Sequence, residues 1–452
     1  MSVSQALAAH RFGFGPQAGR LPARAPAAQV TQADKAVRDF PLPGTLATLA
    51  QMATWRESLR GLPDGSQERR AAIKARQGEI EALVLQNARM ELARAVGAED
   101  SYRERLVRFW ADHFTVKARQ PPMRPMVSAM TDDAIRPHVT ARFAQMLRAA
   151  VLHPAMLGFL DQVASVGPDS AFGQRRGAGL NENLARELLE LHTLGVEGGY
   201  TQADVRQTAL LLTGLAVNET EGTVFQPRRA EPGAETVLGR SYGSNRQPRL
   251  DDIHQLLDDL AAHPTTVRHL CGKLAVHFVS DTPDPGLVAD LVAVWTRSDG
   301  DLKAVSQALA EHPAAERPVL EKARQPFDFV VAALRALGVT GQEIAGWNDR
   351  TLRRTALLPM RAMGQPWQEP NGPDGWEEGF DTWITPQALA IRIDWGMNMP
   401  SRLRPDLPDA RDFVRLALAD LADDDLVRMV SRAERNAEGV GLVLAAPLFN
   451  RR

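Results

Sequence analysis

A helix-forming pattern runs through almost the whole chain and constrains the fold more than any other feature. Ala, Leu, Arg, Glu and Gln dominate, and no segment shows sustained alternation of β-branched residues. Two stretches rich in Pro and Gly, 218–250 and 364–383, interrupt the pattern. We therefore predict an all-α fold, with residues 1–452 forming one large multi-helix globular domain. The stretch 218–250 is expected to be a loop or a small hairpin insertion, at most a short β-hairpin pairing 223–226 with 236–238. The stretch 364–383 is expected to be a long loop rich in Pro, Gly and Trp.

Short polar signals predict where several helices begin and end. Residues 66–97 are typical of a long charged amphipathic helix. Ser101 with Glu104, and Thr201 with Asp204, have the spacing of a capping box at a helix start. Three His-Pro pairs are expected at helix junctions, with His ending one helix and Pro opening the next: 153–154, 263–264 and 312–313.

Composition excludes some classes of function. The chain has 452 residues, 44% hydrophobic and 24% charged, and a formal net charge of -2. That charge supplies no overall field to attract nucleic acid, so no nucleic-acid partner is expected. The apolar runs are too short for a membrane span.

The first residues show no signal-peptide pattern, so a cytoplasmic location is the default expectation. The single cysteine, Cys271, is expected to be inert.

The densest polar chemistry lies in the stretch 181–192, within a helix expected over 181–194. Its polar members are Asn181, Glu182, Asn183, Arg186, Glu187, Glu190 and His192. At about 100° per residue, the helix places Asn183, Glu187 and Glu190 on one side, whereas His192 lies among leucines. Glu182 and Arg186 form a pair four residues apart. Taken alone, the stretch is interpreted as a solvent-exposed carboxylate face with a histidine in the core. A functional site is the alternative interpretation.

Two further groups could join this helix. His113 lies in the apolar stripe of Leu106, Phe109 and Trp110, and Asp161 ends the apolar run 156–160. Buried charges need partners, so these groups would either satisfy one another or form a metal or acid–base site. The spacing matches no metal-binding motif, and it leaves metal and cofactor undetermined.

The loop 364–383 contains three tryptophans: Trp367, Trp376 and Trp383. They could line a pocket or pin the loop to the core. Pinning is the commoner use of such residues.

Several motifs together resemble a bacterial family catalogued as domain of unknown function 1800. The most specific are NENLARELLELHTLGV at 181–196 and GGYTQADV at 198–205. The other matching segments are 10–16 (which contains Arg11), 109–114, 153–161, 211–215, 263–267, 326–331, 364–366 and 446–452.

The resemblance implies a mostly helical fold and no settled activity. Genes of this family often lie beside those of another uncharacterised family, number 1501, which carries export signals. The neighbouring protein is therefore a candidate partner, and a periplasmic location is expected by analogy. The chain departs from the family where a His-Asp…Lys element usually precedes a Leu-Gly: Ala230 and Glu235 replace the His and the Lys. A role that the His and the Lys have in other members is therefore not expected to carry over to this chain.

Three hypotheses of function follow. The first is an accessory or binding protein with a polar cleft formed around the 181–192 helix and the Trp-rich loop. The second is a metal-assisted or acid–base enzyme of the hydrolase class. Its candidate groups are His113, Asp161, Glu187, Glu190 and His192. The third is purely structural, a buried hydrogen-bond network that fixes how the helices pack.

Overall fold

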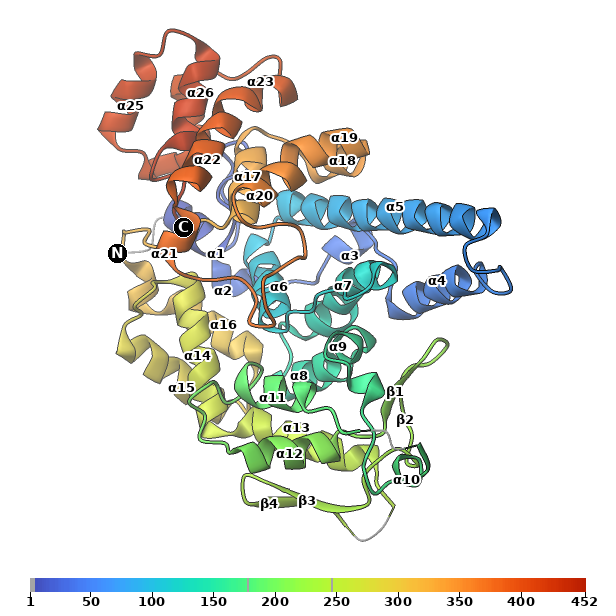
Figure 1. Ribbon diagram of the computed structural model, residues 1–452. Helices are drawn as coiled ribbons and strands as arrows, with labels where there is room; N and C mark the ends of the chain where they lie inside the picture. The colour runs from blue at the N-terminus through green and yellow to red at the C-terminus, as the bar shows by residue number, and fades with distance from the viewer. Residues whose placement is uncertain (1–4, 177–178, 245–246) are drawn as a thin grey trace.

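The computed structural model describes residues 5–176, 179–244 and 247–452, and it confirms the predicted all-α class (Figure 1). Two groups of helices each surround a hydrophobic core of their own. The segment 364–379 passes between these groups, as the orange trace between α20 and α21 shows in Figure 1.

The first core includes the fully buried side chains of Trp110 and Leu188. Its helices are α1 (Gln5–Phe12), α4 (Thr45–Glu57), α6 (Ser101–His113), α7 (Arg124–Met130), α8 (Phe143–Val151), α9 (Pro154–Phe159), α11 (Asn183–Glu190), α12 (Gln202–Leu211), α13 (Leu250–Ala262), α14 (Pro264–Phe278), α15 (Pro285–Arg297) and α16 (Leu302–Glu311).

The second core is formed around the apolar helix α17, of which every residue is buried. Its helices are α5 (Gln67–Gly97), α17 (Pro326–Ala336), α18 (Gly341–Ala345), α19 (Asp349–Leu352), α20 (Leu358–Ala362), α22 (Pro386–Asn398), α24 (Ala410–Leu418), α25 (Asp424–Ser431) and α26 (Asn436–Ala445). The remaining short helices are α2 (Pro26–Gln29), α3 (Ala36–Asp39), α10 (Gly173–Arg176), α21 (Phe380–Trp383) and α23 (Pro400–Leu403). Single 3-10 or π turns lie at Pro121–Met123, Thr131–Ile135, Arg136–His138, Gln162–Ala164, Pro313–Glu316, Arg353–Leu357 and Ala419–Leu421.

The stretch 218–250 contributes to two antiparallel hairpins rather than one. Strand β1 (Leu215–Asn218) pairs with β2 (Gly222–Phe225), and β3 (Gly233–Val237) pairs with β4 (Arg240–Ser244). The two segments that were expected to pair with each other therefore each pair with a sequence neighbour. The β3–β4 turn explains this, because Leu238 and Gly239 both have positive φ (51° and 76°), as the tightest two-residue hairpin turns require.

The predicted helix starts are partly right. Thr201 and Asp204 form the expected capping box of α12. Ser101 does not cap α6: the N-cap is Asp100, and Glu104 instead binds Arg136 through two bonds of 2.6 and 3.0 Å. The His-Pro junctions are confirmed at 263–264 and 312–313, where His263 is the C-cap of α13, His312 is the C-cap of α16 and Pro opens the next helix, whereas the C-cap of α8 lies one residue before His153. At all three junctions the His side chain also caps the following helix. The rings of His153, His263 and His312 each accept a bond from the backbone amide two residues on.

A buried group of charges joins the two cores. We call Arg105, His277, Lys322, Asp328, Glu378 and Arg452 the central ion cluster. Asp328 on α17 accepts ion pairs from Arg105 of α6 at 3.0 Å and from Arg452 at 3.3 Å. All three side chains are nearly inaccessible to water, so each charge depends on the others for compensation.

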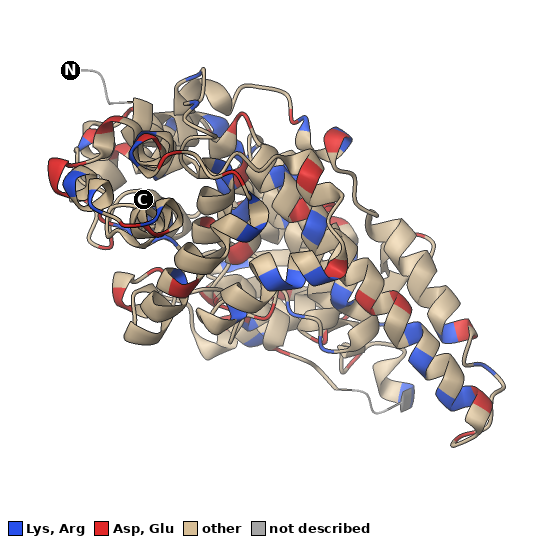
Figure 2. Cartoon of the chain, turned by 90° about the horizontal axis from the view of Figure 1, so that it is seen from above, with Lys and Arg blue, Asp and Glu red and all other residues tan. Residues whose placement is uncertain are grey.

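The surface charges are mixed in sign. Figure 2 shows the positions of basic and acidic residues interspersed along the helices, and the formal net charge is -2. In the described ranges, no helix has the length and apolar character needed to cross a membrane.

Replacing Asp328 by Asn is expected to destabilise the fold by about 3–5 kcal/mol, because Arg105 and Arg452 would lose their shared carboxylate. Urea unfolding followed by circular dichroism would measure this. As a control, Asp425→Asn breaks the exposed pair with Arg428 and should cost less than about 1 kcal/mol. Equal costs for the two variants would contradict the proposed role of the cluster.

Candidate functional site

An open cleft of about 720 Å³ lies where α6, α14 and the 364–379 segment meet. The turn that follows α11 completes its rim. Its walls include apolar groups, of which Val196, Val276 and Trp376 are examples, and its polar groups include Asp112, His113 and Lys273. The cleft therefore combines apolar walls with a few titratable side chains that lie close together. This combination is typical of ligand-binding sites.

Helix α14 supplies one side of the cleft. His263 caps the helix and Pro264 occupies its first turn. His269, Lys273 and His277 then follow at intervals of four residues, so they lie along one face of the helix. His269 and Lys273 line the cleft, and His277 reaches the central ion cluster.

The ring of His113 is held by both of its nitrogens. Nε2 lies 3.2 Å from the carbonyl oxygen of His192, which can only accept, so this nitrogen carries the proton. Nδ1 is then free to accept from the Nζ of Lys273, also at 3.2 Å. Burial, together with the charge of Lys273, lowers the pKa of His113 well below its usual value. The ring is therefore neutral at physiological pH.

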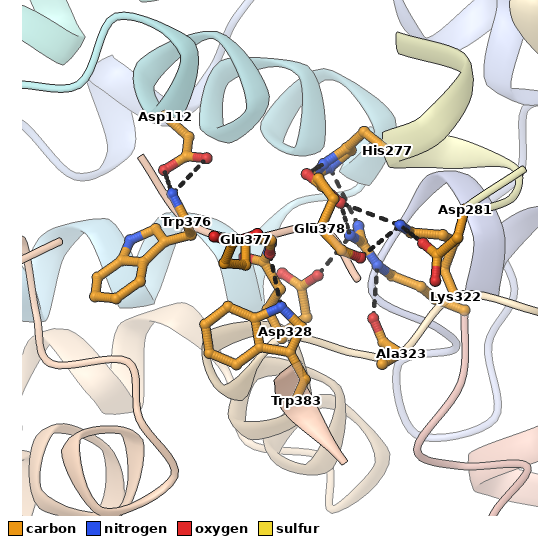
Figure 3. A network of polar contacts seen from close by, with 12 residues as sticks. Asp112, His277, Asp281, Lys322, Ala323, Asp328, Trp376, Glu377, Glu378 and Trp383 are labelled. Atoms are coloured by element: carbon orange, nitrogen blue, oxygen red, sulfur yellow. Dashed lines mark hydrogen bonds and ion pairs between the residues drawn. The ribbon is translucent and has the colours of Figure 1, made fainter. Parts of the chain in front are cut away.

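Asp112 lies beside His113 and contacts the segment 364–379. Its carboxylate accepts the backbone N–H of Trp376, at 3.1 and 3.2 Å from the two oxygens (Figure 3). Burial raises the pKa of Asp112 to about 7, and the charge of Glu378 adds to the effect. This close approach needs Gly375, which has φ +82° and where an added Cβ would lie 2.7 Å from the Asp112 carbonyl oxygen.

Glu378 anchors the same segment at its other end. Its carboxylate binds Nδ1 of His277 and forms an ion pair with Lys322 at 3.4 Å (Figure 3). A second ion pair joins it to Arg452 at 3.6 Å. Burial acts to raise the pKa of Glu378, but its contacts with His277 and the charges of Lys322 and Arg105 outweigh burial and hold the pKa below its ordinary value. Two carboxylates on one cleft thus have pKa values shifted in opposite directions, an arrangement that suits an acid and a base.

The structure brings together two of the residues predicted as catalytic. The rings of His113 and His192 have centroids 6.2 Å apart. Helix α11 ends at Glu190, earlier than expected, because the amides of Leu191 and His192 both donate to the Glu187 carbonyl. The turn buries His192 against Phe114, and burial followed by the charge of Lys273 lowers the pKa of His192 to about 3.

Asp161 has other partners. It forms an exposed ion pair with Arg119 and lies in a left-handed turn at φ 56°. The Asn181 side-chain amide donates to the Asp161 carbonyl at 3.3 Å, while its oxygen accepts from the Asn183 N–H at 2.9 Å. Asn181 therefore links this turn to the start of α11.

The carboxylates of α11 connect it to its neighbours. Glu182 pairs with Arg186 at 3.5 Å, and both bind Gln202 of α12. Glu190 accepts from the Tyr200 hydroxyl at 3.1 Å. Burial, then the charge of Glu190, raises the pKa of half-buried Glu187.

The other predicted polar residues lie outside the cleft. Arg11 is buried and donates to the carbonyls of Ala315 and Val319. Trp367 packs on Phe327, with ring centroids 6.0 Å apart. Among the tryptophans of the loop, Trp376 lines the cleft, whereas the Trp383 indole donates to the Glu377 carbonyl at 2.8 Å (Figure 3).

No three His, Cys, Asp or Glu side chains within the described ranges are grouped so that they could hold a metal ion.

The comparison with known families agrees with the motifs of the sequence. The family described as "Protein of unknown function (DUF1800)" matches residues 7–451. The chain belongs to this family. No curated protein and no solved structure matches it. The family assignment thus covers essentially the whole chain, and it carries no activity.

The sequence motifs did not point to the basic and acidic groups that the cleft adds to His113. Asp112 directly precedes His113, and Lys273 lies midway between His269 and His277. The spacing of four residues on an otherwise apolar helix was the signal that could have identified Lys273. Glu378 had no local signal, because its partners lie far away in the sequence.

We expect Asp112→Asn to gain stability relative to the wild type as pH rises. The folded pKa of about 7 exceeds the unfolded value of about 3.9, so the stabilising contribution of Asp112 is present at low pH and is lost as pH rises through 7. Asn can still accept from the Trp376 N–H. Melting temperatures of both proteins at pH 5 and pH 8.5 would test this.

Asp64→Asn is a suitable control, because that carboxylate is 96% exposed. Its melting temperature should differ from the wild type by the same amount at both pH values. If Asp112→Asn also gave a constant difference, the shifted pKa of Asp112 would be refuted.

Proposed function

We propose that this protein binds a small molecule in the cleft between α6, α14 and the 364–379 segment. The main support for this proposal is that Asp112, His113 and Lys273 lie together in a cleft of about 720 Å³. The apolar part of the ligand would pack on Val276 and Trp376, while its polar part would reach these three groups. This agrees with the predicted binding protein, although α11 contributes mainly through the turn at its end.

Acid–base catalysis in the same cleft is the second candidate. The pair of Asp112 and Glu378 favours it, since one carboxyl is poised near neutral pH and the other is held ionised. Of the residues expected for an enzyme, His113 is the one that lines this cleft. Asp161 and Glu190 form the separate contacts described above.

A structural role accounts for part of the polar motif. Asn181, Glu182 and Arg186 join α11 to neighbouring segments through hydrogen bonds. We propose that these residues support the rim of the cleft from outside. An accessory role beside the protein of family number 1501 stays a prediction, which co-purification of the two proteins would test.

Filling the cleft is expected to abolish binding. Gly272 lines the cleft on α14, and a Cβ added there would meet no atom within 4 Å. Gly272→Phe should therefore occupy the cleft without disturbing the fold, and it replaces a weak helix former. Saturation-transfer NMR with a mixture of amino acids, organic acids and sugars would detect binding.

Gly78→Phe is the matched control, because Gly78 is also within a helix and also faces open space, on α5. We expect wild type and Gly78→Phe to bind the same compounds. Gly272→Phe should bind them about tenfold more weakly or not at all, a loss of at least about 1.4 kcal/mol. Equal binding by all three proteins, or no binding by the wild type, would refute the proposal.

A further inference from the structure

Lysine is rare in this chain, yet one lysine lines the cleft. Of the 53 Lys and Arg residues, only six are lysines: Lys35, Lys74, Lys117, Lys273, Lys303 and Lys322. Arginine stays protonated in proteins, whereas a lysine amine can lose its proton and act as a nucleophile. A lysine at position 273 therefore permits covalent chemistry that arginine would not.

The contacts of Lys273 leave its amine available. Its Nζ donates to Nδ1 of neutral His113 at 3.2 Å. No carboxylate of the described residues lies within ion-pair distance of it. Lys322 is the contrast, since it is fully buried and paired with Asp281 and Glu378. Lys273 is held by one uncharged acceptor and faces the cleft.

The surroundings of Lys273 also disfavour its charge. Burial lowers the pKa of Lys273, although the charges of Asp112 and Glu378 act to raise it. The apolar side chains of Phe109 and Val276 line the same cleft as Lys273. A desolvated amine of this kind is the usual nucleophile toward carbonyl compounds.

We propose that Lys273 captures a small aldehyde or ketone in the cleft as a covalent imine, with Asp112 as the acid. This inference rests on the proposed function, because it names the ligand class of the same cleft. His113 acts as a positioning residue: the His192 carbonyl fixes its protonated nitrogen, so its other nitrogen orients the amine.

The step balances with groups already present. The Lys273 nitrogen lone pair attacks the carbonyl carbon, and one N–H proton moves to the oxygen to give a carbinolamine. The carboxylic acid of Asp112 then donates its proton to the hydroxyl, which leaves as water while the C=N bond forms. The products are a protonated imine, the Asp112 carboxylate and one water molecule. Asp112 and Lys273 line the same cleft, so the two opposite charges of the products remain in one site.

Reductive trapping on the full chain tests the proposal. The protein is incubated with D-glyceraldehyde and sodium cyanoborohydride, and the modified lysines are located by peptide mass mapping. Lys303, which is exposed on α16, is the internal reference. We expect Lys273 to be labelled about tenfold faster than Lys303, because burial lowers the pKa of Lys273 and the cleft holds the carbonyl compound beside its amine. A rate for Lys273 equal to or below that of Lys303 overturns the proposal.

Variants separate the roles. Lys273→Arg keeps the charge and should remove only the Lys273 label. Asp112→Asn should slow labelling of Lys273 at least about tenfold through loss of the acid. If Asp112 acted only through its charge, removing that charge would lower the pKa of Lys273 and speed labelling, which would overturn its role as the acid.

Failure of this inference can be told apart from failure of the proposed function. If the wild type binds compounds that Gly272→Phe does not bind, while Lys273 is labelled no faster than Lys303, the imine is refuted and the binding cleft stands. If Lys273 is labelled equally fast in Gly272→Phe and in the wild type, the cleft is not the route to the amine, and the imine is refuted whatever the binding experiment shows.

Discussion

The contacts that the carboxylates of buried Asp328 and partly buried Glu378 make with basic side chains are the interaction on which the rest of the structure depends. Each is surrounded by groups from segments far apart in the chain, including Arg105 of α6 and the terminal Arg452. Removing one partner of such a cluster leaves an uncompensated buried charge, so the segments must assemble together. The cluster thereby fixes how the two hydrophobic cores meet.

The cleft follows from this arrangement. Glu378 is tied to the cluster and the Trp376 amide is tied to Asp112, so the segment between the cores is held at both points. That segment completes the cleft whose other walls come from α6 and α14. Burial, with the charge of Glu378, raises the pKa of Asp112, while the groups of the cluster hold the pKa of Glu378 below its ordinary value.

The candidate site was only partly predictable. His113 and His192 were recognised because a histidine within an apolar stripe is unusual, and the fold does bring their rings together. Glu187 and Asp161 also lie in polar or apolar patterns that drew notice in the sequence, but neither of them lines the cleft. Glu187 lies near Glu190, and Asp161 forms an exposed ion pair with Arg119. Lys273 looked ordinary in the sequence, because the environment of its amine is created by residues 160 positions away.

The sequence by itself determined the helical class, the start of α12 and the family, because helix propensity, capping and motif identity are local properties. Tertiary structure alone decided which polar groups share a cleft. Burial and charge pairing act across the chain: Glu104 turns to Arg136 instead of capping its helix, and Glu378 reaches Arg452. No spacing in the sequence encodes such pairings, since they exist only once both cores have packed.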